Sequence, residues 1–517
     1  MRLFTLVFLT TLGSGLPSLA QAPLSAIDWL SDSIKDPPEF QIPPETDPLV
    51  TPLVQDISIK KGLAPVSPDA IGLLSPSLTG FSAGLWGDMR AHEIADLLLH
   101  FPNEGTPEAK SVFRRVLLAQ ANPAPDDNQN GLVLQARVAR LFEIGALDAA
   151  EALITLAPAT NPQLFQQKFD IAILTNRTSE VCETLKSTPA ISDDLSARIF
   201  CLARGGDWNA AAITLSLGSG IGAIDPAREE MLIRFLDPEL FEGEPDPIAP
   251  NPLSVMDFVL RESVVLPRPA GLLPLPYLYR DIGSRAPLRA KLEASERLVM
   301  AGSLPSSLLF AAYREGKAAT SGGVWGRASS VQNLDNALAG GNTANITEAL
   351  STAFTDFTDA GLLNALAEEY AETLADLTYS PKYADIRLPV LDLLHLANVS
   401  NLDWANGAVL DDNRQLALAI VTHAPLIINP AGSAMQQSIV NGLNGPLPDS
   451  PAAARLLNLL EGNRQGQAIL SSLQMLSSGA LADPEGVRTG LYTLVAAGQS
   501  GAARRIAVQI LLLPIGG

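Results

Sequence analysis

The 517-residue chain is long enough to bury sizeable hydrophobic cores, because a typical domain needs only about 100–150 residues. Hydrophobic residues make up 47% of the chain and charged residues only 17%, which excludes a chain that is disordered throughout. The 55 Asp and Glu residues outnumber the 35 Lys and Arg residues, and the formal charge of −20 would repel the phosphates of nucleic acid. We therefore exclude nucleic acid as a partner.

Residues 1–20 have the pattern of a secretory signal peptide. Arg2 gives a positive start, and Leu3 to Leu12 form an apolar stretch before a step of small residues. We predict cleavage after Ala20, because a cut two residues later would leave Pro23 directly behind it. The mature chain is then expected to be exported, periplasmic in a cell with two membranes, and to have no transmembrane segment.

The next segment, residues 21–85, is rich in proline and acidic. It carries ten prolines and has eight acidic residues against three lysines. Because proline cannot continue the interior of a helix, we predict an extended segment here. Within it, Asp56 to Gly62 alternates polar and apolar residues, which fits a short edge strand or, more simply, a loop on the helical body.

From Trp86 onward the apolar residues recur with the period of an α-helix. Leu134, Val138 and Leu141 trace one helical stripe, and Gly, Pro, Asn and Asp separate the helices from one another. The sequence contains no convincing series of strands. We therefore predict an all-α fold, an irregular α-solenoid of helical hairpins preceded by the proline-rich segment.

A second proline-rich break divides this helical pattern. It covers residues 237–276 and begins with closely spaced acidic residues and prolines, which is typical of an interdomain linker. We predict one helical repeat domain before it, residues 86–236, and another after it, residues 277–517. The last long apolar run, Ile506 to Ile515, is too short to span a bilayer.

Four windows share a turn glycine followed by small residues on the next helix. They begin at Gly145, Gly206, Gly302 and Gly498, at irregular intervals. A glycine suits the end of one helix, and small residues let the next helix approach its neighbour closely. The windows resemble the second helix of the tetratricopeptide-type repeat, a family of helix-turn-helix solenoids. The resemblance implies an α-solenoid; ordinary helical hairpins with glycine at the turns are the alternative.

The chain has two cysteines, Cys182 and Cys201, in two helical patterns joined by a short turn. They should lie roughly level across an antiparallel hairpin, and an oxidising compartment then favours one disulfide. We predict a structural bridge, because a redox-active pair usually lies closer together, as Cys-x-x-Cys.

The patterns that could mark a catalytic or metal site are incomplete or stand in the wrong context. His92 to Asp96 begins like a zinc-protease motif, but Asp96 replaces the second histidine. Gly80 to Gly84 matches Gly-x-Ser-x-Gly around Ser82, without the preceding strand that this motif requires. We therefore predict no cofactor-binding or metal-binding residues, no cofactor, and no catalytic residue unless the following alternative holds.

One stretch keeps an enzymatic alternative open. Glu262-Ser263-Val264-Val265-Leu266-Pro267 is similar to the Glu-Ser-x-x-x-Pro signature of soluble lytic transglycosylases. Ala270 to Leu273 and Ala312 to Gly316 follow in the order of two further motifs of that family, although the Gln of one and the Asn of the other are missing. The resemblance implies peptidoglycan cleavage with Glu262 as general acid and then base. A solvated Glu262 at a helix end is the interpretation that we favour.

These observations predict an exported, acidic, non-enzymatic scaffold, adaptor or chaperone. Its partner would be a protein or peptide of the cell envelope, bound in a curved groove of the solenoid. A lytic transglycosylase-like enzyme using Glu262 is the alternative. A carrier of a small apolar ligand is a third class, and it would need a closed pocket.

Overall fold

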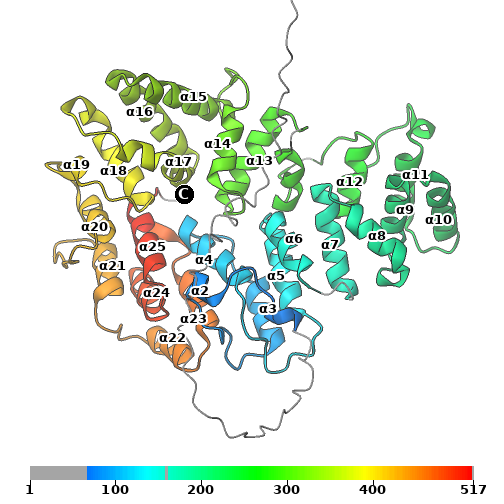
Figure 1. Cartoon of the computed structure of the whole chain (residues 1–517), viewed down its shortest axis with the longest axis horizontal. Coiled ribbons are helices and arrows are strands. Elements are labelled where there is room, and N and C mark those ends of the chain that lie inside the picture. Colours follow the sequence, from blue (N-terminus) through cyan, green and yellow to red (C-terminus); the bar gives the residue numbers. More distant parts are fainter. Residues whose placement is uncertain (1–66, 158–160, 270, 284, 515–517) are drawn as a thin grey trace, which may run out of the picture. The chain divides into compact units, whose positions relative to one another are not determined.

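The computed structural model describes residues 67–157, 161–269, 271–283 and 285–514. Within these ranges the chain is all-α, as predicted, and contains no strand apart from a single bridge between Leu74 and Ala119 (Figure 1). The predicted signal peptide and residues 21–66 of the predicted proline-rich segment lie outside the described residues.

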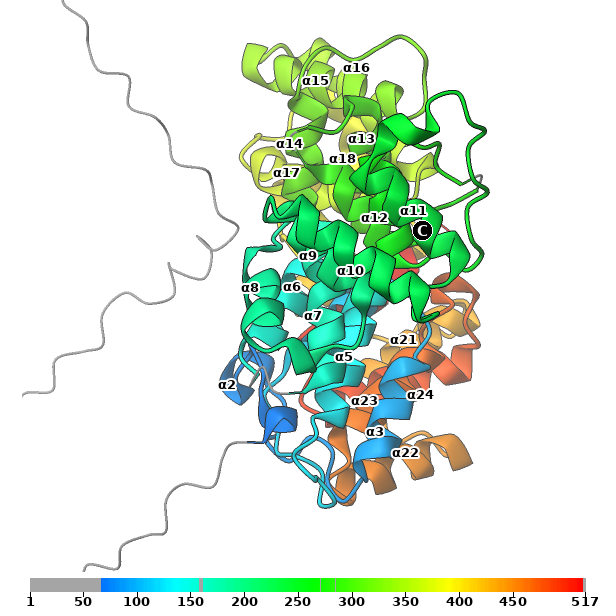
Figure 2. The same cartoon turned by 90° about the vertical axis from the view of Figure 1, so that its right-hand side faces the viewer.

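Short helices follow one another in chain order, and turns of a few residues join many of them (Figure 2). The first part of the described chain contains η1 (Pro68–Ala70), α2 (Pro76–Thr79), α3 (Ala91–Leu99), α4 (Pro107–Leu118), α5 (Leu132–Glu143), α6 (Leu147–Thr155), α7 (Pro162–Thr175), α8 (Ser179–Ser187), η2 (Pro189–Ile191), α9 (Leu195–Arg204), α10 (Trp208–Gly220), α11 (Pro226–Leu236), η3 (Pro238–Phe241) and α12 (Val255–Ser263). The second part contains η4 (Leu275–Ile282), α13 (Leu288–Met300), α14 (Ser306–Arg314), α15 (Val324–Gly340), α16 (Thr343–Asp359), α17 (Leu363–Ala375), η5 (Pro381–Ile386), α18 (Arg387–Leu396), α19 (Leu402–Ala405), α20 (Asp412–Val421), α21 (Ala434–Asn444), α22 (Pro451–Glu461), α23 (Gln465–Met475), η6 (Gly479–Leu481), α24 (Pro484–Ala496) and α25 (Ser500–Leu512).

Local sequence explains where several of these helices begin. Thr106, Asn161 and Asp225 precede α4, α7 and α11, and their side-chain oxygens accept backbone N–H groups of the first turn. Each of the three is followed directly by a proline, whose missing N–H costs nothing at the first helical position.

The four predicted turn glycines each lie between two helices. They separate α5 from α6, α9 from α10, α13 from α14 and α24 from α25, and their φ angles range from +73° to +85°. A side chain would be strained at these angles, so glycine lets each helix pair turn back on itself. The helix-turn-helix part of the prediction is confirmed, whereas membership of the tetratricopeptide family stays a prediction.

Buried apolar side chains form two large hydrophobic cores. The larger core joins helices from both ends of the described chain, and it includes Leu98 together with Ile469 and Ile506. The second core belongs to helices α13 to α19 and is centred on aromatic side chains such as Phe310 and Phe357, whose rings stack at 5.5 Å. The larger core is therefore built from helices that are far apart in the sequence and adjacent in the fold.

Close contacts hold the first described helices against the last ones. The N–H of Gly466 in α23 donates to the carbonyl of Leu85 at 2.7 Å, and a Cβ atom at Gly466 would lie 2.7 Å from the Trp86 ring. Arg505 in α25 pairs with Glu108 in α4 at 2.7 Å. The pair of Arg505 with Glu108 places α4 against α25, and these two helices form one side of the cleft described below.

The segment predicted as a proline-rich linker contains a buried helix. Helix α12 lies inside residues 237–276, and its side chains Phe258 and Leu260 are buried in the larger core. The described residues of both predicted helical domains and of this segment belong to one compact unit. The domain boundaries themselves stay predictions.

Candidate binding cleft

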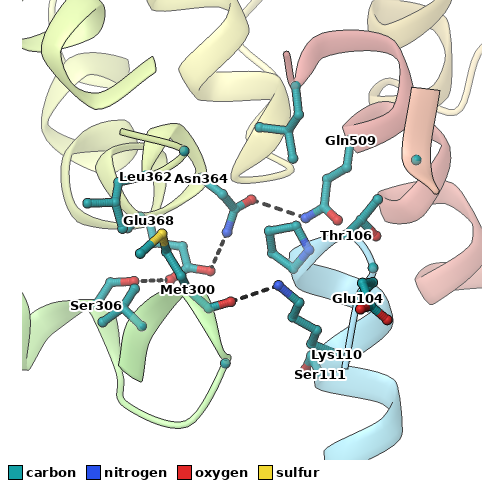
Figure 3. Close-up of a pocket in the computed structure, with 18 of the residues that line it drawn as sticks. Glu104, Thr106, Lys110, Ser111, Met300, Ser306, Leu362, Asn364, Glu368 and Gln509 are labelled. Atoms are coloured by element: carbon teal, nitrogen blue, oxygen red, sulfur yellow. Dashed lines mark hydrogen bonds between the residues drawn. The ribbon is translucent and has the colours of Figure 1, made fainter. Parts of the chain in front are cut away.

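A cleft of about 1120 Å³ opens where distant parts of the chain meet (Figure 3). Its lining comes from the start of α4, the turn between α13 and α14, the turn between α16 and α17, the loop after α23 and the end of α25. Pockets for small molecules usually measure about 300–1,000 Å³, so this cleft has room for a larger ligand.

Two cations of α4 reach across the cleft to the turn between α13 and α14. Lys110 Nζ donates to the carbonyl of Met300 at 2.8 Å, and Arg114 Nη1 donates to the carbonyl of Gly302 at 2.9 Å. Burial lowers the pKa of both groups, because desolvation disfavours their charged forms. Neither cation has an ion-pair partner among the described residues, so both keep N–H donors for a ligand.

A chain of hydrogen bonds joins α14, α17 and α25 on another side of the cleft (Figure 3). Glu368 accepts the hydroxyl of Ser306 at 2.6 Å and the side-chain amide of Asn364 at 2.9 Å. Gln509 in turn donates its amide to Asn364 Oδ1 at 3.1 Å. These bonds fix three helices relative to one another around the opening.

Helices α14 and α17 begin at the cleft without a side-chain cap. The residues before them, Pro305 and Leu362, line the cleft and make no capping hydrogen bond. In α14 the N–H of Leu308 already donates to the Pro305 carbonyl at 3.1 Å, so the N–H groups of Ser306 and Ser307, together with the first N–H groups of α17, are those that an acceptor from a ligand can reach. The carboxylates of Glu104 and Asp359 line the same cleft. The cleft therefore presents both positively charged hydrogen-bond donors and negatively charged acceptors to a ligand.

Cys182 and Cys201 form the predicted disulfide. The bridge joins α8 to α9, with 5.3 Å between the two Cα atoms. Neither cysteine lines the cleft.

Glu262 lies at the C-terminal end of α12, as expected, but it is less solvated than we predicted. It pairs with Arg268 and with Arg280, whose Nε lies 2.9 Å from Glu262 Oε2, and only 18% of its side chain is exposed. Tyr313, in the third stretch compared with lytic transglycosylases, is buried and donates its hydroxyl to Glu296 at 2.6 Å. The compared stretches thus take part in different hydrogen-bond groups, and neither Glu262 nor Tyr313 lines the cleft.

The structure places the two weaker patterns outside the cleft. The Ser82 hydroxyl accepts the N–H of Gly84 at 3.1 Å in a turn, and His92 lies exposed on α3. Among the residues that the structure describes, no group of three or more His, Cys, Asp or Glu side chains could hold a metal ion. No described helix is both long enough and apolar enough to cross a membrane.

No protein-family profile, curated protein or solved structure matches this chain. The fold is all-α and built of helical hairpins, and the cleft is its candidate functional site. Of the cleft residues, the sequence marked only the turn at Gly302 and the small residues after it. Lys110 and Arg114 gave no signal, because the turn that they bind lies about 190 positions away in the chain.

Proposed function

We propose that the protein is an exported helical scaffold, adaptor or chaperone that binds a segment of another cell-envelope protein in the cleft. The observation that carries this proposal is the cleft itself, with its volume of about 1120 Å³ and its mixed polar lining. Helical-repeat proteins commonly bind partners along concave surfaces of this kind.

The lining favours a peptide over a small apolar ligand and over the cell-wall substrate of a lytic enzyme. Carbonyl groups of an extended peptide can accept from Lys110, from Arg114 and from the uncapped starts of α14 and α17. Its N–H groups can donate to carboxylates such as Asp359. A small apolar ligand would displace water from the remaining donors of these groups without replacing its hydrogen bonds, which is costly. Glu262 is held by two arginines away from the cleft, so the contacts do not favour the lytic alternative.

Export and a repeat architecture are parts of the same proposal. Export rests on the sequence pattern of residues 1–20 and is consistent with the disulfide, because structural disulfides persist in oxidising compartments. A tetratricopeptide-like arrangement rests on the four glycine turns and the small residues that follow them.

Filling the cleft tests the proposed function. Ser307 is exposed and lines the cleft, whereas Ser351 is exposed on α16 outside it. We expect the wild-type chain and Ser351→Trp to capture the same envelope protein from extract. We expect Ser307→Trp to capture at least about tenfold less of it, since a bulky side chain excludes the peptide. Equal capture by both variants, or no specific partner of the wild type, would contradict the proposal.

Zymography on cell-wall substrate separates the enzymatic alternative. We expect no clearing by the wild-type chain and none by Glu262→Gln. Clearing by the wild type that Glu262→Gln abolishes would establish the lytic alternative instead.

A further inference from the structure

Helix α10 is apolar on both faces, but only one face is covered. Ala211, Leu215 and Gly218 are buried where α10 packs against α9 and α11 (Figure 1). The whole stretch from Trp208 to Ile224 contains no charged residue. A helix that is apolar all round is normally buried on every side. The uncovered side of α10 is therefore a candidate contact surface.

The uncovered face carries a row of large apolar side chains. Ile213, Leu217 and Ile221 follow one another every fourth residue, and they are 61%, 65% and 78% exposed. Trp208, at the start of the helix, is 50% exposed. Residues four apart lie above one another on a helix, so Ile213, Leu217 and Ile221 form one continuous ridge, whereas Trp208 begins the neighbouring row that continues with Ala212.

A row of small residues runs beside this ridge. Ala212, Ser216 and Gly220 are all exposed, and they are also spaced by four residues. A row of small side chains beside a row of large ones makes a groove beside a ridge. When two helices cross at about 50°, ridges of this spacing pack into grooves of the same spacing.

The surface is therefore complementary to itself. About a twofold axis, the ridge of one α10 fits the groove of a second α10, and the second ridge fits the first groove. A partner that carries the same pair of rows satisfies both at once. A second copy of this chain carries them by definition.

We propose that the exposed face of α10 is an interface between two copies of this chain. The four large side chains offer roughly 400–500 Å² per copy at the observed exposures. That area is about half of the roughly 800 Å² that each partner buries in a standard interface. The dimer is therefore weak and reversible. This inference is independent of the proposed function of the cleft.

Charge gives this dimer a distinctive response to salt. Each chain carries a formal charge of −20, so two copies repel each other over most of their surfaces. The exposed face of α10 carries no charged side chain, so two copies that meet through this face bring no like charges of α10 into contact. Added salt screens the repulsion and leaves the apolar contact intact, so the dimer tightens as salt concentration rises.

Sedimentation equilibrium of the full exported chain at low and high salt tests the interface. We expect a monomer-dimer equilibrium that shifts towards dimer at high salt. Leu217→Glu should weaken the dimer at least about tenfold, because it buries an unpaired charge at the contact. The matched control is Leu308→Glu on α14, where the native side chain is 48% exposed, and it should leave the equilibrium unchanged.

Cross-linking locates the contact without changing its apolar character. No free cysteine is present among the described residues, and the chain's two cysteines are bridged, so Ser216→Cys adds a single thiol. We expect mild oxidation to join two copies through residue 216, and to join few copies of Ser351→Cys on α16. A chain that stays monomeric at every salt and protein concentration would overturn the proposal. So would a dimer that survives Leu217→Glu and does not cross-link through residue 216.

Discussion

Helices α25 and α10 have the same length, 13 residues, and both are rich in apolar side chains. Helix α25 packs against α4, α18, α20, α21 and α24, and it buries every side chain from Ile506 to Leu511. Helix α10 packs mainly against α9 and α11 and buries only three residues. Apolar composition alone therefore does not fix how far a helix is buried. Its neighbours decide that, and many of these neighbours are distant in sequence.

Truncating one isoleucine in each helix should give the largest difference between the two. Ile506 is fully buried, so Ile506→Ala should lower the free energy of unfolding by about 2–5 kcal/mol. Ile213 is 61% exposed, so Ile213→Ala should change it by less than about 0.5 kcal/mol. Urea unfolding at protein concentrations too low for dimers measures both. Equal losses would show that α10 is already covered within one chain.

Removing the disulfide tests how firmly the helices next to α10 are held. The bridge closes a loop with a sequence separation of 19, and replacing both cysteines with alanine should cost about 3 kcal/mol on the loop-entropy model. Hydrogen exchange should speed up in α8 to α10 and stay unchanged in α25. Faster exchange in α25 as well would mean that the two regions unfold as one cooperative unit.

The carboxyl group of Asp170 in α7 should make stability depend on pH. Burial, with a smaller contribution from Asp194, raises its pKa to about 7, and a hydrogen bond from Gln166 lowers it only in part. Because this pKa is raised on folding, the group destabilises the folded chain increasingly as pH rises from about 4 to 7. Asp170→Asn does not titrate, so it should exceed the wild type in stability at pH 8 by roughly 2–4 kcal/mol more than at pH 4.

Free energies of unfolding at the two pH values test this expectation. Asp246 is exposed, and Asp246→Asn should change stability little at either pH. Parallel pH profiles for the wild type and Asp170→Asn would contradict the inferred burial of this carboxyl group.

Two glycines should respond to alanine with opposite signs. Gly466→Ala places a Cβ atom 2.7 Å from the Trp86 ring, at the junction between the first and last helices, and should cost about 1–3 kcal/mol. Gly326 lies in α15 with nothing within 4 Å of an added Cβ, so Gly326→Ala should stabilise by about 0.5–1 kcal/mol. Thermal melting distinguishes them. A stabilising Gly466→Ala would mean that Trp86 does not pack on α23.

Local features of the fold could be predicted from the sequence, and long-range ones could not. Helical periodicity, the turn at Gly302 and the pairing of Cys182 with Cys201 depend on residues close together in the chain. The cleft depends on contacts such as that of Glu108 with Arg505, which are 397 positions apart. No period or motif marks such a contact. Glu262 shows the same limit, because its helix-end position was predicted but its pairing with Arg268 and Arg280 was not.

One cross-linking measurement in living cells tests most directly whether the cleft binds another protein and whether α10 contacts α10 of a second copy of the chain. A photoreactive amino acid replaces Met300, which lines the cleft and is 38% exposed, or Leu217 on α10. At position 300 we predict an adduct between the chain and a different envelope protein. At position 217 we predict an adduct with the mass of two chains. No adduct at position 300, or one that contains only two copies of the chain, would contradict the proposed role of the cleft.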